Sequence, residues 1–118
     1  MPHRSLRVLV VDDNDDSAQS MALWLRFRGH DVAVARDGAE ALTEADRYQP
    51  EAVVLDLGLP GLDGVEVARR LRAGPTGPAL RLIALTGRLE REDNAGNDFD
   101  AWFVKPVTPM EIAEALQG

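Results

Sequence analysis

Five polar residues stand at the ends of short aliphatic runs: Asp12, Asp13, Asp56, Thr86 and Lys105. If these runs are neighbouring parallel strands, their carboxyl ends meet at one edge of a sheet, which is where open parallel sheets bind ligands. Three carboxylates within ~4 Å of one another repel by roughly 4 kcal/mol per pair at an effective dielectric constant near 20. Such a cluster therefore needs protonation, dilution by solvent or a cation.

Carboxylate ligands select a hard cation, and a site with few protein ligands and several waters suits Mg²⁺. Three carboxylates, one Mg²⁺ ion and Lys105 together carry no net charge. A nearly neutral site with a divalent ion, a lysine and a hydroxyl is suited to an incoming phosphoryl group. Each of these residues also has a simpler explanation when it is considered alone. Asp12 or Asp56 alone would be a loop cap, Thr86 a turn residue and Lys105 a surface lysine. Their joint placement at the ends of four runs favours a site.

The elements that must position these residues alternate in type along the chain. Short, mostly apolar runs, each too short for a helix, are typical of strands covered on both faces. Helix-like stretches separate them, which predicts parallel βαβ units and an α/β fold class, a doubly wound (βα)5 sheet of five parallel strands. The predicted strands are Leu6–Val11, Val32–Ala35, Ala52–Leu55, Leu80–Leu85 and Ala101–Val104.

The helix-like stretches also carry signals for where helices begin and end. Apolar residues at i, i+3, i+4 and i+7 predict a first helix through residues 18–25, and Gly29 follows as its stop. Capping patterns at residues 37–40, 63–66 and 108–111 predict three further helix starts, the last with a proline at the first helical position.

Composition limits the class of protein. The 118 residues fit one domain, residues 1–118, and no linker or repeat interrupts them. The absence of cysteine excludes disulfides, thiolate zinc sites and thiol nucleophiles. A formal charge of −7 disfavours direct nucleic-acid binding. The longest apolar run, Met21–Leu25, is far too short for a membrane span, so we expect a cytoplasmic domain with no membrane insertion.

Four motifs resemble those of the receiver domain of two-component response regulators. The resemblance covers nearly the whole chain, and residues 29–42 look most like receivers of hybrid histidine kinases or single-domain response regulators. It implies a flavodoxin-like sheet with the strand order 2-1-3-4-5. The motifs are LVVDDN at 9–14, VVLDLGLPGLDG at 53–64, ALTG at 84–87 and FVKP at 103–106.

The resemblance implies a phosphorelay function for the acidic residues. Asp56 is expected to accept a phosphoryl group from a histidine kinase or a histidine phosphotransfer protein, with Mg²⁺ as cofactor, and later to lose it to water. Asp13, Asp56 and the main-chain carbonyl of Gly58 are expected to ligate Mg²⁺, with Asp12 acting mainly through a bound water. An unidentified protein is expected as the downstream target.

The resemblance also assigns residues on the last two strands. Thr86 and Lys105 are expected to hold phosphoryl oxygens, and the peptide bond between Lys105 and Pro106 is expected to be cis. Trp102 matches the position of an aromatic switch that works with Thr86. A tryptophan at the end of a strand is equally well explained as a core cover whose indole N–H reaches water.

Three other functions compete with this interpretation. A phosphatase of the haloacid dehalogenase type uses an Asp nucleophile, Mg²⁺ and a Lys, but its second Asp stands two residues after the nucleophile, where this chain has Gly58. A flavodoxin-like cofactor binder is disfavoured because the glycines from Gly58 to Gly64 do not form a phosphate loop leading directly from a strand into a helix. A phosphorylation-independent adaptor has no need of the complete five-residue set. We expect no independent substrate turnover. We expect these 118 residues to hold no DNA-binding or catalytic output domain, whether the chain is a single-domain protein or a receiver within a longer polypeptide.

Some features depart from the family pattern. Thr86 and Lys105 are closer in sequence than is usual, which predicts a shortened fourth helix. The segment 88–98 between them contains only Leu89 and Ala95 as apolar residues, so we expect it to be mobile and to become ordered on phosphorylation. Gly58 and Gly87 are expected to leave the site open to water. The isolated histidines, His3 and His30, are interpreted as surface or loop residues.

Overall fold

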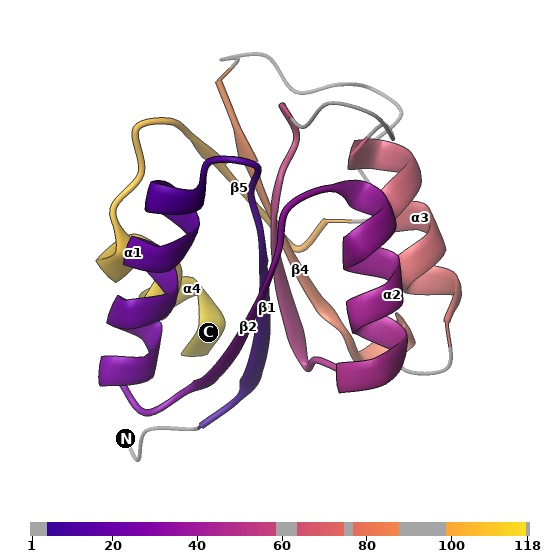
Figure 1. Ribbon diagram of the computed structural model, residues 1–118, viewed down its shortest axis with the longest axis horizontal. Coiled ribbons are helices and arrows are strands. Elements are labelled where there is room, and N and C mark those ends of the chain that lie inside the picture. Colours follow the sequence, from indigo (N-terminus) through magenta and orange to yellow (C-terminus); the bar gives the residue numbers. More distant parts are fainter. Residues whose placement is uncertain (1–4, 59–63, 75–76, 88–98, 118) are drawn as a thin grey trace.

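The computed structural model describes residues 5–58, 64–74, 77–87 and 99–117 (Figure 1). All five predicted strands are present and parallel, and they lie in one sheet in the order β2-β1-β3-β4-β5, as the resemblance implied. The strands are β1 (Arg7–Val11), β2 (Asp31–Ala35), β3 (Ala52–Asp56), β4 (Arg81–Thr86) and β5 (Ala101–Val104).

Helices cover both faces of this sheet (Figure 1). α1 (Asp15–Phe27) and α4 (Pro109–Gln117) lie on one face, and α2 (Gly38–Tyr48) and α3 (Gly64–Ala73) lie on the other. A short 3-10 turn, η1 (Gly77–Ala79), leads into β4. No helix among the described residues is both long enough and apolar enough to cross a membrane.

The two faces of the sheet have separate cores because successive strand residues point to opposite sides. Val8 and Val10 of β1 pack with the α1 and α4 side chains, whereas Leu9 and Val11 pack with those of α2 and α3. β3 repeats the pattern and is buried along its whole length. At about 25 cal/mol per Å² of apolar surface, this burial is the main stabilising contribution to the layered fold.

Local signals in the sequence set the ends of the helices. Gly29 takes a φ of 96° directly after α1, a conformation that favours glycine. The Asp37 side chain accepts the Glu40 N–H at 2.8 Å at the start of α2. Thr108 and Glu111 form a capping box at α4, with Thr108 N–H donating to Glu111 at 2.8 Å and Glu111 N–H donating to the Thr108 hydroxyl at 3.2 Å.

Asp56 and Thr86 close β3 and β4, as the sequence predicts, and extend these strands one residue beyond the predicted apolar runs. One expectation needs correction. His30 is not at the surface: it is 4% exposed, and its Nδ1 accepts the Leu6 N–H at 3.1 Å. A polar side chain is tolerated at a buried position when it satisfies a backbone group, as His30 does at the entry to the sheet.

Other expectations fall on residues that the structure does not describe. The shortened fourth helix and the mobility of the segment 88–98 both lie outside the described residues. So do the cap at Asp63 and the environment of His3.

Candidate functional site

The site residues meet because four strands end at the same edge of the sheet. Asp56 pairs with Leu85 in β4, and the last residue of β4, Thr86, pairs with Val104 in β5. The Asp12 N–H donates to the Ala35 carbonyl at 3.0 Å, which fixes the chain where it leaves β1. Parallel pairing in this register therefore brings the ends of β1, β3, β4 and β5 together.

Three carboxylates form a cluster at this edge, as the sequence predicts. One oxygen each of Asp12, Asp13 and Asp56 lies within 4.8 Å of the others. Asp56 is 3% and Asp12 is 8% exposed, while Asp13 is exposed to solvent. Such a set of hard oxygen donors, open to water on one side, fits Mg²⁺, which prefers a few carboxylates and several water ligands.

Both carboxylate oxygens of Asp56 have partners. The Lys105 Nζ lies 2.5 Å from Oδ2, and the Gly58 N–H donates to Oδ1 at 2.8 Å. A Cβ at position 58 would stand 3.3 Å from Oδ1, so glycine is the residue that leaves this oxygen uncrowded. No described atom lies within 4 Å of the place where a Cβ at Gly87 would stand, beyond its own chain neighbours. Gly58 therefore keeps the surroundings of Asp56 open within the described part of the chain.

The electrostatic environment of Asp12 differs from that of an exposed aspartate. Burial raises the pKa of the Asp12 carboxyl, and the nearby charges of Asp56 and Asp13 act in the same direction. The Asn14 N–H, which donates to Asp12 Oδ1 at 2.9 Å, and the Lys105 ammonium partly oppose this rise. A bound cation would favour the ionised form and thus relieve the repulsion within the cluster.

The Thr86 side chain lies on the opposite side of the sheet from the pocket that holds Asp56 and Lys105. Along β4, Thr86 follows the alternation of Leu82 and Ala84, which pack on the α2 and α3 side. Its side chain does not line the pocket described below, although its carbonyl accepts the Lys105 N–H at 2.8 Å. Thr86 and Lys105 are therefore neighbours through the backbone.

Trp102 lies on the same side of the sheet as Thr86. It is half-buried and packs against Phe99, with ring centroids 5.1 Å apart in an edge-to-face arrangement. A core cover fits this position, but the indole N–H of Trp102 is buried in the protein rather than reaching water. The aromatic switch stays a prediction. The peptide bond between Lys105 and Pro106 is cis, as expected.

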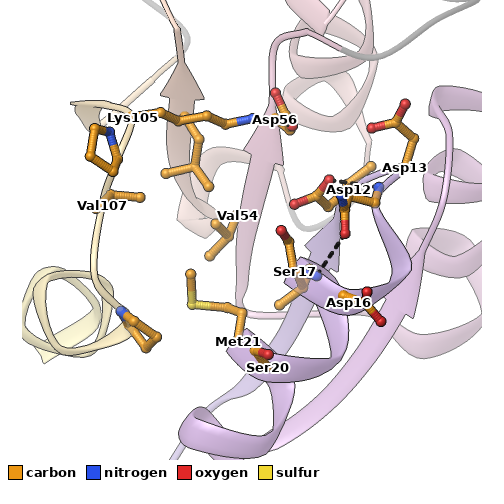
Figure 2. Close-up of a pocket in the computed structure, with 16 residues that line it drawn as sticks. Asp12, Asp13, Asp16, Ser17, Ser20, Met21, Val54, Asp56, Lys105 and Val107 are labelled. Atoms are coloured by element: carbon orange, nitrogen blue, oxygen red, sulfur yellow. Dashed lines mark hydrogen bonds and ion pairs between the residues drawn. The ribbon is translucent and has the colours of Figure 1, made fainter.

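A pocket of about 820 Å³ holds the acidic cluster and Lys105, and it extends along the face that carries α1 and α4 (Figure 2). The residues predicted from the sequence line only the part of this pocket at the strand ends. Its other part is lined by residues whose types do not by themselves indicate chemistry, among them Ser17, Ser20 and Met21 of α1. These three are spaced i, i+3 and i+4 in the sequence, so a helical-wheel projection would have placed them on one face of the first helix.

Similar proteins were found both by sequence and by structure. The family model described as the response regulator receiver domain matches residues 8–117. The DNA-binding response regulator MtrA of Mycolicibacterium smegmatis is 39% identical over 112 residues, covering 95% of this chain and 49% of that protein. The transcriptional regulatory protein PrrA of Mycobacterium bovis is 42% identical over 115 residues, covering 97% of this chain and 49% of that protein. The chain thus spans about half the length of these curated relatives.

Solved structures with the same fold include chemotaxis response regulator CheY4 of Vibrio cholerae, with a TM-score of 0.88 and 26% identity, covering 97% of this chain and 98% of that one. TrrA of Thermotoga maritima, solved in complex with Mg²⁺ and BeF, has a TM-score of 0.83 and 29% identity, covering 94% and 96% of the two chains. With the five polar residues at the strand ends and the family match over nearly the whole length, this chain belongs to the receiver domains of two-component response regulators.

Proposed function

We propose that this chain accepts a phosphoryl group on Asp56 and passes the signal on within a two-component phosphorelay. The observation that carries the proposal is the position of Asp56: a buried carboxylate, 2.5 Å from the Lys105 ammonium and clustered with Asp12 and Asp13. The expected donor is a histidine kinase or a histidine phosphotransfer protein, because histidine kinases are the partners of response regulators.

Asp12, Asp13 and Asp56 would hold Mg²⁺, with the Gly58 carbonyl as a further ligand and Asp12 acting mainly through water. When bound, the ion supplies positive charge to the nucleophile and to the phosphoryl oxygens together. The carboxylate cluster supports this assignment because its three charges, close together and partly buried, otherwise repel one another.

Several residues of the chain have separate roles in the phosphoryl transfer. An oxygen of Asp56 attacks phosphorus, a P–O bond forms, and the P–N bond to the donor histidine breaks with its electron pair staying on the imidazole. Lys105, whose side chain is 41% exposed and therefore free to adjust, exchanges its ion pair with Asp56 for a phosphoryl oxygen. The Gly58 N–H stays on the Asp56 carboxyl, and Thr86 donates its hydroxyl to another phosphoryl oxygen.

The proposed output is a conformational change that begins at Thr86. A Thr86 hydroxyl drawn toward the phosphoryl group would vacate space on the side of the sheet where Trp102 lies. Trp102 is then the proposed switch residue. Water finally hydrolyses the acyl phosphate, which Gly58 and Gly87 leave accessible.

Receiver domains are signalling domains, and we propose that this one turns over no independent substrate. A phosphatase of the haloacid dehalogenase type is not favoured, since the family match places the chain among receivers. The mycobacterial relatives are regulators of about twice its length, one named as DNA-binding. A protein as its target, a cytoplasmic location and the lack of direct nucleic-acid contact remain predictions.

The test is phosphorylation by acetyl phosphate in the presence of Mg²⁺, followed by intact mass spectrometry. We expect the wild-type protein to gain one phosphoryl group and Asp56→Asn to gain none, because an amide is not a nucleophile here. Asp46→Asn is the matched control, since Asp46 is an exposed carboxylate on α2. A wild-type protein that gains no mass, or an Asp56→Asn protein that still gains it, would reject the proposal.

A further inference from the structure

The loop between β1 and α1 carries two of the three clustered carboxylates, Asp12 and Asp13, and it is held at both of its ends. On the β1 side, the Asp12 N–H donates to the Ala35 carbonyl at 3.0 Å. On the α1 side, the Asn14 side chain accepts the Ser17 N–H at 2.9 Å and caps the helix (Figure 2). Asp13 is exposed to solvent, so its place in the cluster depends on the two residues that are held on either side of it.

Asn14 links the helix cap to the carboxylate cluster, because its side chain and its backbone bond to different partners. Its side-chain oxygen holds the first turn of α1, while its backbone N–H donates to Asp12 Oδ1 at 2.9 Å. Asn14 has an extended backbone, with φ −86° and ψ 109°, as is usual for a residue that caps a helix. The cap that keeps Asn14 in this conformation therefore also keeps its N–H directed at the Asp12 carboxylate.

The orientation of Asp12 matters because its carboxylate is buried among like charges. Asp12 is 8% exposed, and one of its oxygens lies within 4.8 Å of oxygens of Asp13 and Asp56. The hydrogen bond from Asn14 fixes the rotation of the Asp12 carboxylate, although the neighbouring charges repel it. Groups that orient metal ligands without touching the metal contribute strongly to metal affinity.

We propose that Asn14 is a positioning residue for Mg²⁺: by capping α1, it holds the Asp12 and Asp13 carboxylates in the arrangement that binds the ion. This inference rests on the proposed function and adds to it a residue that is not a ligand. Without the cap, the first turn of α1 is open in a larger share of the molecules. The apparent affinity of a site falls in proportion to the fraction of molecules in the binding conformation.

Mg²⁺ titrations followed by NMR test the proposal, with the amide signal of Gly58, which contacts Asp56, reporting the dissociation constant. Asn14→Ala removes the cap and should raise this constant about three- to tenfold, the range that corresponds to the loss of a typical helix cap. Asn14→Ser retains a cap oxygen and should bind within about twofold of the wild type. In metal-free Asn14→Ala, the amide proton of residue 14 should move upfield, because its hydrogen bond to Asp12 is weaker.

The cap of another helix provides the matched control. Asp37 caps α2 in the same way, by accepting the Glu40 N–H at 2.8 Å, and it lies outside the carboxylate cluster. Asp37→Ala and Asp37→Asn both remove one charge, but only Asp37→Ala removes the cap. These two variants should differ in stability to urea and should have the same Mg²⁺ dissociation constant.

An unchanged affinity in Asn14→Ala would overturn the inference. Weak binding by Asn14→Ser would also overturn it, because the amide group of Asn14 rather than its cap would then act on the ion. Weaker binding by Asp37→Ala than by Asp37→Asn would overturn it as well, because the loss of any cap would then have this effect. A wild-type protein that binds no Mg²⁺ would instead reject the metal site of the proposed function, so the two failures are distinguishable.

Discussion

Asp56 stands apart from the other two carboxylates because both of its oxygens are held before any phosphoryl group arrives. Lys105 holds Oδ2 and the Gly58 N–H holds Oδ1, while Asp13 is exposed to solvent. Interactions that fix the orientation of a nucleophile in advance lower the entropic part of the reaction barrier. The residues that hold Asp56 are thus expected to control the rate of phosphorylation.

Gly58→Ala should slow phosphorylation of Asp56 by acetyl phosphate about three- to tenfold, which corresponds to ~0.7–1.4 kcal/mol in the barrier. The added Cβ would stand 3.3 Å from Asp56 Oδ1 and would displace this oxygen by a few tenths of an ångström. Gly87→Ala is the matched control, because a Cβ there meets no described atom within 4 Å beyond its chain neighbours. Equal rates for both variants and the wild type would contradict this role of Gly58, and stopped-flow tryptophan fluorescence or mass spectrometry can measure them.

At the scale of elements, β5 is the strand whose position matters most, since it lies at the edge of the sheet and Lys105 directly follows it. Its start is anchored by Asp100. The Asp100 carboxylate accepts the buried Leu82 N–H at 2.8 Å and lies 3.2 Å from Arg72 of α3. The same Arg72 donates to the carbonyls of Gly77 and Leu80, so one guanidinium joins α3, η1, β4 and the start of β5.

Asp100→Ala should lower the free energy of unfolding by about 1–3 kcal/mol, because it leaves the Leu82 N–H without its acceptor inside the protein. Asp100→Asn keeps an acceptor oxygen and should cost less, losing mainly the charge of the pair with Arg72, which is modest at a partly exposed position. Urea denaturation followed by circular dichroism measures both. If both variants were as stable as the wild type, Asp100 would not anchor β5.

At the scale of the whole molecule, negative charge exceeds positive charge, with a formal net charge of −7, and three of the acids are concentrated at one edge of the sheet. Their mutual repulsion opposes folding, since the unfolded chain can separate them. A cation that binds the folded chain alone stabilises it by mass action, by about 2.7 kcal/mol at a concentration one hundred times the dissociation constant. Folding and metal binding are therefore coupled.

Addition of Mg²⁺ should raise the melting temperature of the wild-type protein. Asp13→Asn should make the metal-free protein more stable, by less than about 1 kcal/mol because Asp13 is exposed, and should reduce the effect of Mg²⁺. Differential scanning calorimetry with and without EDTA checks both effects, and Asp46→Asn controls for the loss of one negative charge. The coupling would be refuted by a wild-type melting temperature that does not respond to millimolar Mg²⁺.

The sequence by itself determined the order of elements and the residue types at the strand ends. Both are local properties: apolar runs such as Ala52–Leu55 and caps such as Asp37 act on neighbouring residues, so their effect can be predicted without knowledge of the fold. The grouping of Asp12, Asp13 and Asp56 followed from one further rule, that parallel strands end at the same edge of a sheet.

Only the tertiary structure decided what depends on residues far apart in sequence. The buried His30 accepts a hydrogen bond from the backbone of Leu6, and the ion pair between Asp56 and Lys105 joins residues that are 49 positions apart. The pocket beside the carboxylate cluster is lined by residues of α1, β1 and β3 and by the segment that leads into α4. Its volume is set by packing between elements that are far apart in sequence, so the sequence pattern indicates which residues share a helix face but not how much space lies between the elements.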